Sequence, residues 1–353
     1  MRIRGLYLML LLGVLAWSTC LDEIEIEPAD RPETGYVIQG SLVAGEPAAV
    51  SIRVERLFFF TSNINQIVSD AQVSLVAESG TSQEIAWDAA NRVYQATLDA
   101  ASFPVEEGQR YRVEVSLSDG TEIESDWDEV MPAPAVGNLN WQFTEVETEG
   151  ANGVISLRPG IAFSVDGPLL TSTGDAAQIR WEFIDAYRIT DNLDSICYVE
   201  NQHRAGQVIL LDGTEVGGDA VQNYPLFSDL IGLKLIEGYY LTAYQQSLSP
   251  DAFDYWKEVQ LLLEREGTVF DNPAGRVATN LRNTTDSTGI VYGYFSAYQQ
   301  DTIRLFVSRG DMGNLASYCP RPPTNQPFPP ITICDNCIDA LGASYEQPFY
   351  WEE

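Results

Sequence analysis

The sequence predicts a mainly β protein with two modules: an N-terminal Ig-like or transthyretin-like β-sandwich over residues 36–130, and a second β-rich domain over residues 136–317. Three observations predict this fold class. Short runs of alternating apolar and polar residues recur between turn-forming residues. Only residues 250–266 have a clear helical spacing of apolar residues. A linker with two prolines, residues 131–135, separates two series of strands in a chain long enough for two cores.

The chain begins with a segment that is typical of exported proteins. Two arginines precede an apolar run over residues 6–17, which is shorter than the roughly 20 residues needed to span a bilayer. The run leads to Cys20, and this ending looks like a bacterial lipoprotein signal. We therefore expect residues 1–19 to be removed and Cys20 to be lipidated. Trp17 and Thr19 depart from the usual residues before such a cysteine, so the alternative is an ordinary cleaved signal that leaves Cys20 for a disulfide.

Residues 20–35 are expected to form an acidic tether. Four acidic residues follow the cysteine within seven positions: Asp22, Glu23, Glu25 and Glu27. This cluster resembles the acidic export tag of surface lipoproteins in the Bacteroidota. A solvated tether in an acidic protein explains the same residues equally well, so both readings stay open.

The charge of the chain excludes several classes of function. The formal net charge is −31, and removal of residues 1–19, which contain two arginines and no acid, makes it −33. Nucleic acid is excluded as a partner because binding it requires Lys and Arg to neutralise phosphates. A basic patch cannot hold such a chain on an anionic membrane, so the membrane contact is expected through the N-terminal lipid. The single histidine, His203, excludes most metal sites and most Ser-His or Cys-His catalytic arrangements.

The first module contains about seven expected strands and no helix pattern, which favours a small β-sandwich. The strands are expected within 36–44, 48–60, 73–77, 93–97, 111–117 and 121–127, and the clearest period of two is Tyr111, Val113, Val115 and Leu117. Asp119-Gly120 is a tight hairpin signal between the last two strands. Phe58, Phe59 and Phe60 break the alternation, either as a buried strand end or as an exposed apolar contact patch.

The second module is expected to contain further strands and one helix. The strands are expected within 139–148, 154–165, 177–184, 197–199, 208–211, 233–245, and a hairpin-like pair over 289–297 and 302–307. Ser249 is an expected N-cap, and proline occupies the first helical position after it. The apolar face comprises Phe253, Trp256, Val259, Leu262 and Leu263. We expect this face to pack against a sheet; the alternative is a partner-binding helix.

The proline-rich tail, residues 318–353, is expected to be pinned by disulfides. Four cysteines besides Cys20 are available: Cys197, Cys319, Cys334 and Cys337. An even number in an exported chain indicates two disulfides, and three pairings are possible. In one of them the Cys-x-x-Cys closes on itself and leaves the other two cysteines to pair. No second Cys-x-x-Cys and no nearby histidine accompany this motif, so a structural role is favoured over a redox or metal role.

The order of these features resembles the Bacteroidota outer-membrane lipoproteins grouped as domain of unknown function 4249. The resemblance covers essentially the whole chain and rests on the cysteine with its acidic followers, Ala71-Gln72-Val73, Val93-Tyr94, Gly108-Gln109-Arg110-Tyr111-Arg112-Val113, the proline linker, Ser249-Pro250, Phe270-Asp271-Asn272-Pro273, Asn280, Gly293-Tyr294-Phe295-Ser296-Ala297, the Cys-x-x-Cys and the final Trp351. Such proteins are often encoded beside TonB-dependent receptors. The resemblance implies a role on the cell surface as an accessory or substrate-capturing partner of such a transporter.

The function expected from the sequence is therefore that of a lipid-anchored outer-membrane protein that faces the cell exterior and binds a transporter. Candidate contact residues are Tyr239, Tyr240 and Tyr244, or the three phenylalanines at 58–60, although each could instead belong to a strand core. A structural or adhesive surface protein is the first alternative. A surface glycan or peptide hydrolase is the second, but the chain has no Gly-x-Ser-x-Gly motif, and 51 acids produce carboxylate pairs by chance. We expect no enzyme activity, cofactor or metal.

Overall fold

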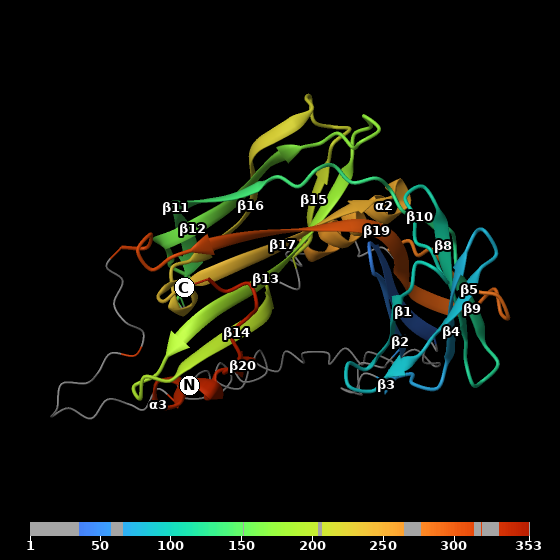
Figure 1. The fold of residues 1–353 in the computed structure, drawn as a ribbon, viewed down its shortest axis with the longest axis horizontal. Coiled ribbons are helices and arrows are strands. Elements are labelled where there is room, and N and C mark those ends of the chain that lie inside the picture. Colours follow the sequence, from blue (N-terminus) through green and yellow to red (C-terminus); the bar gives the residue numbers. More distant parts are fainter. Residues whose placement is uncertain are drawn as a thin grey trace, which may run out of the picture.

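The computed structural model describes residues 35–57, 66–150, 152–203, 207–264, 277–313, 319 and 332–352. Within these residues the chain is mainly β, as predicted (Figure 1). The expected signal, the expected lipidation site and residues 318 and 320–331 of the proline-rich tail lie outside the described residues. None of the helices in the described part of the chain has the length and apolar content needed to cross a bilayer.

The N-terminal half is a sandwich of two sheets, as the alternating patterns predict. The first sheet contains β1 (Gly35–Ala44), β2 (Ala48–Arg56), β3 (Gln66–Ile67), β6 (Trp87–Asp88) and β7 (Val93–Leu98). The second contains β4 (Gln72–Ala77), β5 (Ser82–Ile85), β8 (Arg110–Ser116), β9 (Glu122–Ser125), β10 (Asp128–Glu129) and β18 (Leu281–Asn283). Alternation along β2, β4 and β8 buries one face of each of these strands, and Ile38 and Ile52 meet Val113 and Val115 in a core from which water is excluded.

One long strand joins the two halves of the molecule. β19 (Ile290–Val307) pairs in parallel with β1 through its first ten residues and antiparallel with β17 (Tyr239–Leu248) through its last nine. A single eleven-stranded sheet therefore runs through both halves (Figure 1). The hairpin-like pair expected over residues 289–307 is wrong, because these residues form one continuous strand.

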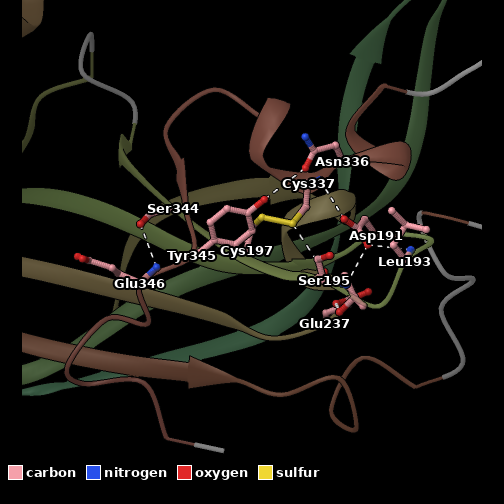
Figure 2. Close-up of a disulfide and its surroundings, with 11 residues drawn as sticks. Asp191, Leu193, Ser195, Cys197, Glu237, Asn336, Cys337, Ser344, Tyr345 and Glu346 are labelled. Carbon is pink, nitrogen blue, oxygen red and sulfur yellow. Dashed lines mark hydrogen bonds between the residues drawn. A yellow bond between two sulfur atoms is a disulfide. The ribbon is translucent and has the colours of Figure 1, made fainter.

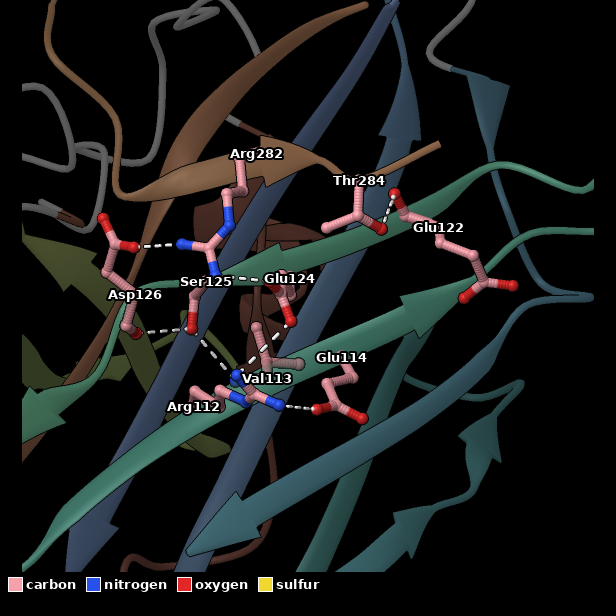
Figure 3. Close-up of polar contacts among 9 residues, drawn as sticks. All are labelled: Arg112, Val113, Glu114, Glu122, Glu124, Ser125, Asp126, Arg282 and Thr284. Atoms are coloured by element: carbon pink, nitrogen blue, oxygen red, sulfur yellow. Dashed lines mark hydrogen bonds and ion pairs between the residues drawn. The ribbon is translucent and has the colours of Figure 1, made fainter. Parts of the chain in front are cut away.

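The predicted sandwich of residues 36–130 is not closed by those residues alone. β18 pairs with β9, and Leu281, Val291, Phe295 and Ala297 from the second half of the sequence are buried in the sandwich core. Arg282 of β18 forms ion pairs with Glu124 and Asp126, and Glu124 also lies 3.3 Å from Arg112 (Figure 3). The first module therefore depends on strands that the sequence pattern assigns to the second.

The second half contains the rest of the large sheet and a smaller sheet packed on it. The large sheet continues through β17, β13 (Gln178–Thr190), β14 (Ile196–His203), β15 (Ile209–Asp212) and β20 (Ala343–Ser344). The smaller sheet has the order β11 (Asn138–Glu149), β12 (Ile155–Pro168) and β16 (Ala220–Leu230). Between the sheets, the ring of Phe163 lies 5.1 Å from that of Phe227 and 5.9 Å from that of Tyr239. Three short helical turns complete the fold: η1 (Leu233–Leu235), α3 (Thr332–Asp335) and η2 (Cys337–Asp339).

The predicted helix is present as α2 (Pro250–Leu263). Ser249 is its N-cap, and its hydroxyl accepts a hydrogen bond from the backbone N–H of Ala252 at 3.2 Å. Phe253 is buried against β15 and β19, as expected for a helix that packs on a sheet. The last turn of the helix is less buried, since Leu263 is 52% exposed. The predicted end of the helix at residue 266 lies outside the described residues.

A buried carboxylate, that of Asp128, ties α2 to both halves of the molecule. The hydroxyl of Ser249 donates a hydrogen bond to one of its oxygens, and the backbone N–H of Ala297 donates to the other at 2.7 Å. Asp128 is 3% exposed, and burial raises its pKa to about 6 although both hydrogen bonds oppose the shift. The strands β10 and β19, which belong to different sheets, and the N-terminus of the helix therefore meet at one side chain.

Asp128→Asn is expected to gain stability relative to the unsubstituted protein as the pH rises. The carboxyl titrates near 3.8 when unfolded and near 6 when folded, so between these values the folded state binds more protons. The stability that protonation confers is complete below the lower value and lost above the upper one. Asparagine stays neutral throughout, so the difference in unfolding free energy should rise by about 2 kcal/mol between roughly pH 4 and pH 7. Urea unfolding of both proteins measures it, and a pH-independent difference would contradict the assignment.

The disulfides join Cys197 to Cys337 and Cys319 to Cys334. The Cys-x-x-Cys therefore does not close on itself; its two cysteines take separate partners. The longer-range disulfide lies beside a loop that Asp191 organises, because this carboxylate accepts backbone hydrogen bonds from Leu193, Ser195 and Cys337 (Figure 2). Further along, Trp351 is 6% exposed and packs on the rings of Tyr198 and Tyr240. The end of the chain is thus fixed to the large sheet.

Candidate functional site

A groove of about 400 Å³ lies at the junction of the two halves. Its lining residues come from β1, β2, β7, β13, α2 and β19, which the shared strand brings together. Figure 1 shows α2 and β19 meeting at this junction, above the strands of the N-terminal sheet. The volume falls in the range of small-molecule sites, which are often found at domain junctions.

The first wall of the groove is the outer face of β1 and β2. The same alternation that buries Ile38 and Ile52 directs Gln39, Ser41 and Arg53 outward. Of these, Ser41 is directly paired with Ser51 across the two strands. Small polar side chains on this face leave open space that larger ones would fill.

The second wall consists of β13 and α2, and it holds an arginine in a fixed position. The guanidinium of Arg180 lies over the indole ring of Trp256, 3.5 Å from the ring centroid. It donates hydrogen bonds to Glu182 at 2.6 Å and to Gln246 at 3.0 Å. Its side chain is 12% exposed. A planar guanidinium held by a ring and two acceptors is a rigid part of the groove.

The floor of the groove is made by tyrosines of β19. Tyr294 stacks on Tyr255 of α2 with ring centroids 4.5 Å apart, and Tyr298 lies further along the same strand. Burial raises the pKa of Tyr298 to about 12, and it also raises the pKa of Tyr294, to which the carboxylate of Asp128 contributes. Both phenols therefore stay neutral at physiological pH and present hydrogen-bonding groups without charge.

The charged groups of the groove are balanced. Arg180 is paired with Glu182, and Arg53 lies 3.6 Å from Glu55. The lining residues include neither histidine nor cysteine. Among the residues that the structure describes, no group of three or more His, Cys, Asp or Glu side chains is arranged to hold a metal ion. The arrangement offers hydrogen bonds and flat aromatic surfaces, which suit binding.

The structure places the candidate contact tyrosines mostly in the core. Tyr239 is 2% exposed and donates a hydrogen bond to Asp185 at 2.6 Å, and Tyr240 is 6% exposed beneath Trp351. Both side chains therefore occupy the strand core, which is the alternative expected for them, because β17 is covered on both of its faces. Tyr244 is half-buried. Cys20, Phe58, Phe59 and Phe60 lie outside the described residues.

Sequence reasoning missed the residues that build the groove. Arg180 and Glu182 lie within the strand expected over residues 177–184, and Trp256 lies on the apolar face expected to pack against a sheet. Tyr294 and Ser296 lie within the Gly-Tyr-Phe-Ser-Ala run, which was the available signal.

A second feature is the exposed end of the hairpin formed by β11 and β12. The two strands stay paired as far as Glu149 and Ile155, whereas β16 pairs with β12 only from Gly160 onward. Three apolar residues at this end are more than half exposed: Val154, Ile155 and Leu157. We call these three residues the apolar hairpin end. Exposed apolar residues that gather in one place are typical of protein-contact surfaces.

Comparison with known proteins gives one match. A family model described as "Domain of unknown function (DUF4249)" matches residues 22–304. No curated protein and no solved structure matches the chain.

Proposed function

The chain belongs to the DUF4249 family, and from this premise we propose that it is a surface-exposed outer-membrane lipoprotein that serves as the accessory or substrate-capturing partner of a TonB-dependent transporter. Its proposed anchor is an acyl group on Cys20. The groove supports the substrate-capturing part of the proposal, because it is of ligand size and offers binding chemistry. An acyl anchor would hold this protein and the transporter in one membrane, which raises their effective concentration.

The observation that carries the partnership is the apolar hairpin end. Val154, Ile155 and Leu157 are 57%, 65% and 58% exposed, respectively. In a protein with this excess of acidic residues, a cluster of exposed apolar side chains stabilises nothing in the isolated chain. Contact with a partner would remove this apolar surface from water. We assign the transporter as that partner.

The test is crosslinking in a host that carries the native transporter. We expect the intact lipoprotein to yield one crosslinked product in which mass spectrometry identifies a TonB-dependent barrel. The variant Ile155→Ser/Leu157→Ser should lose most of this product while retaining its thermal stability, because both side chains are exposed. Cys20→Ser should lose both the fatty-acyl label and the product, since it removes the anchor.

The matched control is Leu193→Ser/Leu341→Ser, which changes two leucines that are 77% and 91% exposed elsewhere on the surface. This variant should crosslink as the unsubstituted protein does. Equal crosslinking by the hairpin variant and the control would refute the assignment of the contact. An unlabelled Cys20 would refute the anchor, and an adhesive role would be indicated if the lipoprotein were surface-exposed but crosslinked to no barrel.

A further inference from the structure

The groove continues into a second hollow along the outer face of the N-terminal sheet. This hollow has a volume of about 460 Å³ and is lined by residues of β1, β2, β6 and β7. It shares Ser41 and Ser51 with the groove. Because these serines are direct neighbours across β1 and β2, the two hollows adjoin at one pair of small side chains. An elongated ligand could therefore lie across both.

The groove contains an indole ring that is only partly buried, that of Trp256. Trp87 borders the second hollow, but its ring packs edge-on against Tyr94 and the sandwich core. The indole nitrogen of Trp256 and the Nε atom of Arg180 are buried without a hydrogen-bond acceptor. Polar groups that a protein leaves unpaired call for an explanation. After a small movement of the two side chains, a hydroxyl group of a ligand could accept a hydrogen bond from one of these nitrogens.

The charges along the two hollows argue against an ionic ligand. Arg180 is paired with Glu182, and Arg53 is paired with Glu55. The second hollow has one charged residue in its lining, Asp88, whose carboxylate accepts hydrogen bonds from the backbone of Ala90 and Asn91 and from the side chains of Asn91 and Gln95.

These pairings decide between ligand classes. An anion would meet no unpaired cation in the lining and would be repelled by a chain of net charge −31. A cation would find the carboxylates already engaged. A purely apolar ligand would bury the serine and glutamine side chains of the lining without partners, which is costly.

We propose that the two hollows form one binding track for a neutral oligosaccharide. Its hydroxyl groups would pair with the serine, glutamine and tyrosine side chains of the lining, and the C–H face of one of its sugar rings would pack on Trp256. This inference rests on the substrate-capturing role proposed above. It concerns the ligand alone, so it is tested with purified protein and without the transporter.

The experiment is calorimetric titration of the purified full chain in detergent at physiological ionic strength. The neutral probes are maltohexaose, cellohexaose and laminarihexaose, with their disaccharides, and the acidic probe is hexagalacturonate. We expect at least one neutral hexasaccharide to bind at least about tenfold more tightly than its disaccharide, because only the longer chain reaches both hollows. Trp256→Ala should weaken binding of that hexasaccharide by about tenfold or more.

Two further variants keep the proposal falsifiable should Trp256→Ala fold poorly. Ser51→Trp places a large side chain at the junction of the hollows, on a β-strand, where aromatic residues are well tolerated. This variant should bind the hexasaccharide no more tightly than the disaccharide. Trp127→Ala is the matched control, because Trp127 stacks with Arg112 at 4.8 Å in an arginine–tryptophan pair outside the track. It should leave binding unchanged.

The possible results separate the two proposals. Absence of binding by every neutral hexasaccharide, tighter binding of hexagalacturonate, or equal losses in Trp256→Ala and Trp127→Ala would overturn the saccharide track. None of these results bears on crosslinking to the transporter. Conversely, a failed crosslink with intact saccharide binding would overturn the partnership and leave the track in place.

Discussion

Gly293→Ala is expected to disrupt the junction between the two halves and to cost about 4–5 kcal/mol of stability, or to prevent folding. Gly293 has a φ of +98°, a conformation that residues with a side chain rarely adopt. A Cβ atom at this position would lie 1.9 Å from the carbonyl oxygen of Ile38. Because that oxygen belongs to the paired strand β1, relief of the clash requires the backbone of β1 or β19 to move.

Gly80→Ala is the matched control for this prediction. Gly80 has a φ of +94°, nearly the same as that of Gly293, but no atom lies within 4 Å of its hypothetical Cβ. Gly80→Ala should lower the free energy of unfolding by only about 1 kcal/mol, which is the cost of the backbone conformation alone. The excess loss in Gly293→Ala, measured by urea unfolding, would then report the close approach of β1 and β19. Equal losses in the two variants would show that the clash is relieved without breaking the strand pair.

The run Gly293-Tyr294-Phe295-Ser296-Ala297 has a physical explanation in this strand. Its odd-numbered positions contact the N-terminal half. The absence of a side chain at Gly293 leaves room for the backbone of β1. Phe295 is fully buried in the sandwich core, and the backbone N–H of Ala297 donates a hydrogen bond to Asp128. Its even-numbered positions, Tyr294 and Ser296, line the groove. The alternation of a strand thus assigns one face to the sandwich core and the other to the candidate site.

Much of the secondary structure could be predicted because local rules determine it. The period of two over Tyr111, Val113 and Val115 identifies β8, and Ser249-Pro250 marks the start of α2. The shared strand could not be predicted in this way. Alternation shows that a residue is buried but not which sheet buries it, and the polar residues at 299–301 interrupt the apolar pattern where β19 changes partner from β1 to β17.

The candidate site could not be predicted because its walls come from distant parts of the chain. Arg180 and Trp256 are 76 positions apart in the printed sequence, and only the packing of α2 on β13 brings them into contact. The sequence also leaves open whether the candidate tyrosines are surface contacts or part of a strand core. The structure buries Tyr239 against Asp185 and Tyr240 against Trp351, because β17 is an interior strand between β13 and β19.

The second large effect is expected from the loss of the disulfide between Cys197 and Cys337. This bond closes a loop with a sequence separation of 140, whereas the bond between Cys319 and Cys334 spans 15. A crosslink stabilises mainly by limiting the freedom of the unfolded chain, and the effect grows with the loop. Cys197→Ala/Cys337→Ala should therefore cost about 5 kcal/mol, and Cys319→Ala/Cys334→Ala about 3 kcal/mol.

The order of these two losses is the decisive measurement, because it depends on the pairing. Had the Cys-x-x-Cys closed on itself and Cys197 paired with Cys319, each double variant would break both disulfides, and the two losses would be about equal. In the observed pairing, Cys337 instead fixes the C-terminal segment to β14, beside the loop that Asp191 organises. Denaturant unfolding of the two double variants gives the comparison. A smaller loss for Cys197→Ala/Cys337→Ala than for Cys319→Ala/Cys334→Ala would mean that the long loop is already restricted in the unfolded chain.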